Sequence, residues 1–99
     1  MTDAIETAAA LLPAETSVAA IEAALARPIV AGRAARELAS HELRMAREEH
    51  YLMVERCGNG ILADAPEARK AALLASTHHD WVVASTRYRL TCQTRKLAA

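Results

Sequence analysis

The sequence contains no phenylalanine, and one tryptophan and two tyrosines are its only aromatic residues. Just over half of the chain is hydrophobic, but much of that share is alanine. Alanine has the highest helix propensity and contributes little apolar area. We therefore expect closely packed helices rather than a core built on large side chains.

An excess of charge of one sign is also lacking, because 12 basic residues balance 12 acidic ones. This balance argues against a dedicated nucleic-acid binder and against a polybasic membrane anchor. The signs are nevertheless segregated, since residues 1–26 carry only acidic charges and residues 81–99 only basic ones. Either the two ends face solvent separately, or the acidic N-terminal helix packs near the basic C-terminal helix.

Cysteine and long apolar runs are scarce. Cys57 and Cys92 stand in neither a CxxC nor a Cys/His zinc spacing, so we expect reduced thiols in a cytoplasmic protein. No apolar run approaches the ~18 residues of a membrane span, and Met1-Thr2-Asp3 lacks the basic region of a signal peptide. Catalytic signatures such as GxSxG, HExxH or a glycine-rich phosphate loop are missing, so neither an enzyme activity nor a cofactor is predicted.

Three prolines and three glycines divide the chain into helical segments. Thr2 or Asp3 is expected to cap a short first helix that ends before Pro13. Pro13 is expected in the first turn of a second helix, which Pro28 ends. The apolar stripe of this second helix is formed by Val18, Ile21 and Leu25. Residues 29–32 form either a linker or the first turn of the next helix.

The longest predicted helix covers residues 29–57. Its apolar arc is broader than a coiled-coil seam and includes Leu38, Met45 and Leu52, so we expect it to contact two neighbours. Gly58-Asn59-Gly60 is expected to end it in a left-handed C-cap. Asp64 is expected to cap a last helix over residues 66–95, which completes a helical hairpin.

Residues 76–94 are rich in threonine, valine, histidine and tyrosine, which also suit strands. Helical spacing separates apolar from polar positions better than strand alternation does, and no glycine or proline interrupts residues 67–97, so we favour a helix. Two apolar rows would then run along it, one formed by Leu74, Trp81 and Tyr88 and the other by Val83, Leu90 and Leu97. One row is expected in the core and the other in an interface, without a sequence signal to say which is which.

Three charged residues, Glu42, Glu49 and Arg56, recur every seven positions inside the apolar arc of the long helix. Buried charges are costly unless they are paired or bind a metal. They could pair with arginines of another helix, such as Arg69 or Arg87, or form a polar layer that sets the register of a dimer. A carboxylate–histidine metal site is the third alternative, but the bundle motif Glu-x-x-His is missing, so no metal is predicted.

A winged-helix fold is the main alternative to a helical bundle. Residues 28–39 resemble the first half of a helix-turn-helix, and residues 88–91 resemble a wing strand. The resemblance implies an α+β fold and binding to duplex DNA. Such domains need a turn near Ser40, where this sequence continues its helical pattern, and the would-be recognition helix carries four glutamates.

The sequence therefore predicts a single all-α domain over residues 1–99: a long antiparallel helical hairpin with one or two shorter N-terminal helices. We expect a homo-oligomer, with a dimer as the simplest form, or a complex with another protein. The predicted function is a non-enzymatic helical interaction module, such as an assembly subunit, export chaperone or small regulatory adaptor. DNA binding and metal binding remain the alternatives.

Overall fold

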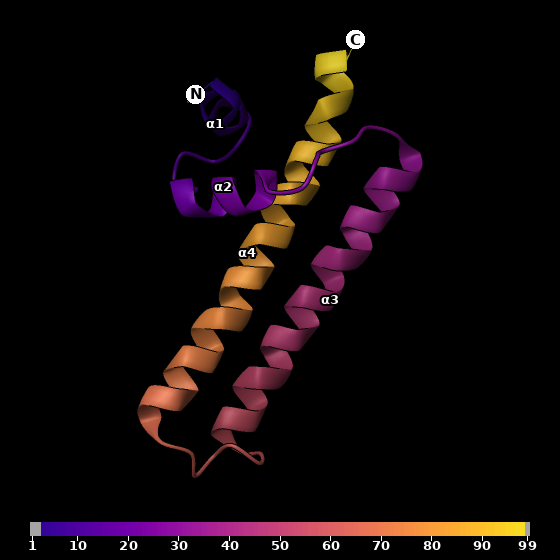
Figure 1. Cartoon of the computed structure of the whole chain (residues 1–99). Coiled ribbons are helices and arrows are strands. Elements are labelled where there is room, and N and C mark those ends of the chain that lie inside the picture. The colour runs from indigo at the N-terminus through magenta and orange to yellow at the C-terminus, as the bar shows by residue number, and fades with distance from the viewer. Residues whose placement is uncertain (1–2, 99) are drawn as a thin grey trace.

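The computed structural model describes the backbone of residues 3–98 and the side chains of residues 4–94. The four helices are α1 (Asp3–Ala10), α2 (Val18–Leu25), α3 (Arg33–Gly58) and α4 (Glu67–Ala98). Helices α3 and α4 lie side by side as a long antiparallel hairpin, and α2 crosses α4 with α1 above it (Figure 1). Residues 3–98 contain no strand, so the all-α prediction is confirmed and the winged-helix alternative is wrong about the fold.

The helical prediction for residues 76–94 is also confirmed, despite their low helix propensity. Threonine hydroxyls along this stretch donate hydrogen bonds to carbonyls of the preceding turn, as Thr86 does to Val82 (2.8 Å) and Thr91 to Arg87 (2.7 Å). Such bonds satisfy a buried hydroxyl without a partner from another helix. Thr86 and Thr91 can therefore be buried at the centre of the fold.

The start of α2 differs from the prediction. The helix begins at Val18, and Ser17 caps it by accepting a hydrogen bond from the backbone N–H of Ala20 (3.2 Å). Pro13 instead belongs to the preceding turn, where its carbonyl accepts from the N–H of Thr16 (3.0 Å). The serine hydroxyl accepts from a backbone N–H of the first turn that has no partner within the helix. Proline has no side-chain acceptor and cannot cap a helix in this way.

Residues 29–32 form a linker rather than a first helical turn. Gly32 has a φ of 116°, and α3 begins at the next residue. Only glycine adopts this backbone conformation at little cost. Arg36 then donates its N–H to the carbonyl of Gly32 (3.0 Å), which closes the first turn of α3.

The hairpin turn does not use the predicted left-handed C-cap, because Gly32 alone among the described residues has a positive φ. The N–H groups of Asn59 and Gly60 both donate to the carbonyl of Glu55, at 2.8 and 3.1 Å. This tight winding brings Gly60 against the helix, where a Cβ atom would lie 2.8 Å from the Cα of Arg56. Asp64 does not cap α4, which begins three residues later at Glu67.

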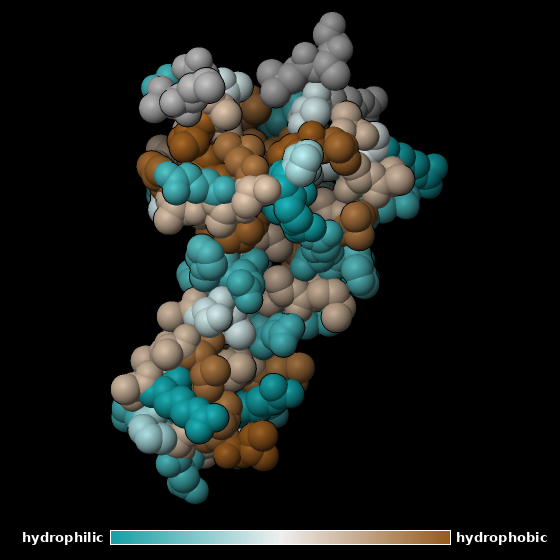
Figure 2. All heavy atoms as spheres, viewed as in Figure 1, coloured by the Kyte–Doolittle hydropathy of each residue, from teal (hydrophilic) through white to brown (hydrophobic). Residues whose placement is uncertain are grey.

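The core lies at one end of the hairpin, where α1 and α2 cover α4. Its buried residues are Ala8, Leu12, Ile21, Ala24 and Leu90. Figure 2 shows apolar atoms gathered over this layered end and again near the hairpin turn, with polar atoms between them. Because the hairpin extends well beyond this core, the molecule is elongated, with extents of 52 × 29 × 20 Å.

Candidate interaction surface

The seam between α3 and α4 consists of small and polar residues as well as apolar ones. On α3 the less exposed positions follow a spacing of three and four residues through Ala39, Leu43, Ala46, His50, Met53 and Cys57. His50 faces Thr77 of α4, with Nδ1 and Oγ1 2.8 Å apart. The Thr77 hydroxyl lies 3.2 Å from two carbonyls of its own helix, so we assign Nδ1–H of His50 as the donor to Thr77.

An aromatic cluster closes the seam beside this hydrogen bond. The ring of Trp81 lies 5.5 Å from Tyr51 and 5.7 Å from His50, measured between centroids. The ring of His78 lies 5.5 Å from that of His50 and 6.2 Å from that of Trp81, again between centroids. These tilted and edge-on contacts anchor α4 to α3.

Residues of both apolar rows predicted on α4 make contacts within the chain. Trp81 contacts α3 through the aromatic cluster, and Tyr88 lines a hollow together with Arg36 and Arg44 of α3. Leu74, the third member of that row, is half-buried. In the other row, Leu90 is 4% exposed and Val83 packs against the same core, whereas the side chain of Leu97 lies outside the described residues. An additional role of either row in an interface stays a prediction.

The three charged residues predicted for a buried layer differ in their exposure and in their partners. Glu42 is half-buried and pairs with Arg27 at 3.2 Å, rather than with Arg69 or Arg87. Glu49 and Arg56 are exposed. These three residues therefore form no buried layer among the described residues, because α4 covers only one side of α3.

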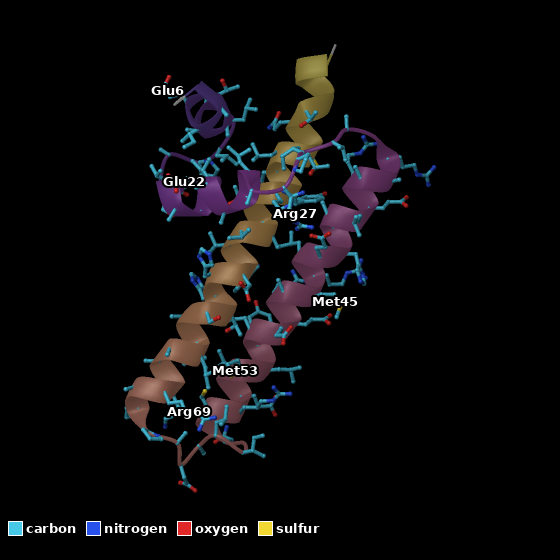
Figure 3. All side chains as sticks on the ribbon, viewed as in Figure 1. Glu6, Glu22, Arg27, Met45, Met53 and Arg69 are labelled. Carbon is cyan, nitrogen blue, oxygen red and sulfur yellow. The ribbon has the colours of Figure 1, made fainter. Side chains whose placement is uncertain are left out.

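An exposed apolar row runs along α3 beside the seam. Leu38, Met45 and Leu52 are 59%, 51% and 50% exposed, and each precedes a seam residue by one position. In Figure 3 Met45 points to the side of α3 that faces away from α4. The spacing of seven places these three side chains on one line along the helix.

Beside this row, α3 and α4 form a groove. One hollow of about 270 Å³ is lined by His41, Glu42, Met45, Glu49, Thr77 and Asp80. A second hollow of about 370 Å³ shares Glu42 and Asp80 with it and extends to Arg27 of the chain segment after α2. We call this feature the acidic groove, defined by Glu42, Met45, Glu49 and Asp80.

Arg87 fixes the upper boundary of the acidic groove. Its guanidinium donates hydrogen bonds to the carbonyls of Ala24, Arg27 (3.0 Å) and Pro28 (3.3 Å), at the C-terminal end of α2. Burial lowers the pKa of Arg87, and the nearby charge of Arg27 acts in the same direction, whereas Glu42 opposes both. A cation at the end of a helix is favourable because the last carbonyls are unpaired.

Sequence reasoning missed this role of Arg87. A basic residue near the last carbonyls of its own helix can be recognised from its position. Arg87 lies 60 residues from Arg27, so only the packing of α2 on α4 brings it there. Of the two alternatives for the charged ends, the N-terminal and C-terminal segments do pack together here, through a contact made by backbone carbonyls.

The described residues offer little for metal or nucleophile chemistry. No group of three or more His, Cys, Asp or Glu side chains in this part of the chain is arranged to hold a metal ion. Cys57 is buried and Cys92 half-buried, and both are free thiols. Over the same residues, no helix has the length and apolar character that crossing a bilayer demands.

Comparison of the chain with protein families, curated proteins and solved structures gives no match in any of the three.

Proposed function

We propose that the protein is a non-enzymatic helical interaction module, and that its contact surface is the acidic groove together with Leu38, Met45 and Leu52. The observation that carries the proposal is that these three large side chains are each at least half exposed along one line. Exposed apolar side chains rimmed by polar residues are a feature of interaction sites. An assembly subunit, an export chaperone and a regulatory adaptor would all use such a surface.

The packing of α3 on α4 along the seam also supports this proposal. Packing against α4 already occupies the row that contains Ala39, Ala46 and His50, so α3 is held in place without the exposed row. Leu38, Met45 and Leu52 are therefore free to contact another chain without unfolding the hairpin. That chain is either a second copy or a different protein.

Photocrosslinking tests the proposal directly. A benzoylphenylalanine placed at Met45 should give a discrete adduct in cells that naturally make the protein, identified by mass spectrometry. The matched control carries the same group at Arg47, which is exposed on the opposite flank of α3. Adducts at both positions in equal yield, or none at Met45, would contradict the proposal.

Sedimentation equilibrium of the wild type then identifies self-association. A dimer that dissociates on Leu38→Gln and Leu52→Gln would make a second copy the partner. A monomer that still gives a Met45 adduct of another mass would make the partner a different protein.

A further inference from the structure

We propose that the occupant of the acidic groove is a basic amphipathic helix of another protein. This inference rests on the proposed function and adds the chemical class of the partner. It is carried by three properties of the surface: its length, its charge and its poor fit to a second copy.

The exposed row has the dimensions of a helix-binding surface. Leu38 and Leu52 are 14 residues apart, which corresponds to about 21 Å along α3. A partner helix of four turns would cover this length, with its own apolar residues at positions i, i+3 or i+4, and i+7. The open hollow beside Met45 would receive one of these side chains.

The charge of the groove is acidic in its middle and basic at its ends. Glu49 and Asp80 make no ion pair with any described side chain, whereas the charge of Glu42 is shared with Arg27. Arg27 and Arg87 both line the upper end. The spacing of seven places Arg56 below Glu49 on the same side of α3. A complementary helix would therefore place its lysines or arginines in its central two turns.

A second copy fits this surface poorly in the registers that align the two exposed rows, because like charges would meet. An antiparallel pairing of two α3 helices about Met45 places Glu42 close to Glu49 of the other copy, and the reverse. A parallel pairing in register places each glutamate next to its own counterpart. Like charges brought together at an interface are unfavourable, so a basic partner satisfies the acidic side better.

Binding of two defined peptides tests the inference. Both are fluorescein-labelled 18-residue helices with leucine at the same positions, flanked by lysine in one peptide and by glutamate in the other. Fluorescence anisotropy should show at least tenfold tighter binding of the lysine peptide to the full-length protein. Equal binding of the two peptides would overturn the inference.

Charge reversal locates the binding site. The double variant Glu49→Lys, Asp80→Lys should weaken binding of the lysine peptide at least tenfold, with unchanged helix content by circular dichroism. The control Glu6→Lys, Glu22→Lys makes the same change in net charge at exposed positions of α1 and α2, outside the groove and the exposed row, and should stay within twofold of the wild type. An equal loss in the control would show general charge attraction and would overturn the groove assignment.

The experiments separate failure of this inference from failure of the proposed function. A specific Met45 adduct without preference for the lysine peptide would refute the basic helix but leave the interaction module standing. A wild-type dimer broken by Leu38→Gln and Leu52→Gln would assign the surface to a second copy and also refute the inference. If neither the adduct nor peptide binding is found, both proposals fail.

Discussion

The two ends of the hairpin differ in how many helices share their apolar surface. At the layered end, α2 packs on α4 and α1 packs on α2, and Ile21 and Leu90 are almost completely buried. At the hairpin end, α3 and α4 have only each other, and Leu52, Val54 and Ile61 are about half exposed or more. Two helices in contact can each cover only one face of the other. The apolar residues that α4 does not cover, from Leu38 near the start of α3 to Leu52 near the hairpin end, therefore become available for another chain.

The core of the layered end should show the largest loss of stability on mutation. Ile21, 2% exposed, is surrounded by α1 and α4, and Ile21→Ala should lower the free energy of unfolding by about 3 kcal/mol. Urea denaturation measures this loss. The control Val18→Ala, one turn earlier at 58% exposure, should change stability by less than about 0.5 kcal/mol. Equal losses would mean that Ile21 is not packed as a core residue.

The attachment of α2 to α4 should show the next largest effect. Arg87→Met keeps much of the side-chain length but removes the hydrogen bonds to the three carbonyls, and should cost about 2 kcal/mol. Thermal unfolding compared with Arg89→Met, at an exposed position of the same helix, measures the difference. If the two variants melt together, the carbonyl contacts do not hold the layered end in place.

The turn at the hairpin end gives a pair of glycines with opposite expected signs. Gly60→Ala should destabilise by about 1 to 2 kcal/mol, because its Cβ would lie 2.8 Å from the Cα of Arg56. Gly58→Ala, at the end of α3 with no atom within 4 Å of the new Cβ, should stabilise by about 0.5 kcal/mol through higher helix propensity. Urea denaturation of both variants tests the signs, and a shared sign would refute this account of the turn.

The seam should show the smallest of these losses. Thr77→Val leaves Nδ1–H of His50 without its acceptor and should cost about 1 kcal/mol. Thr86→Val removes a hydroxyl that bonds its own helix, and should change stability by less than about 0.5 kcal/mol. Chemical denaturation compares the two. A larger loss for Thr86→Val would contradict the role of the His50–Thr77 contact.

Several elements could be predicted from the sequence because their causes are local. The hairpin follows from helical periodicity interrupted by Pro28 and by the segment from Gly58 to Pro66. The helical state of residues 76–94 was predicted from the apolar rows against the strand preference of the individual residues. The positions of the caps were harder, because Ser17, Pro13 and Asp64 all have plausible local roles and the final packing selects among them.

Only part of the candidate surface could be predicted from the sequence. The apolar arc predicted for the long helix includes Leu38, Met45 and Leu52, and Glu42 and Glu49 are charges within that arc. The sequence did not show that α4 covers one side of that arc and leaves the other exposed. It also gave no sign that Glu42 would pair with Arg27, 15 residues away and beyond the linker.

The set of helices and the apolar and charged rows on each follow from the sequence, because they depend on spacing along one chain. Which row is covered, which carbonyls Arg87 contacts and why the acidic groove stays open follow only from the packing of the helices. Those features depend on how α1 and α2, too short to span the hairpin, settle on one end of α4. The number of helices available to cover each face, rather than the pattern of any single helix, leaves α3 with an unpartnered side.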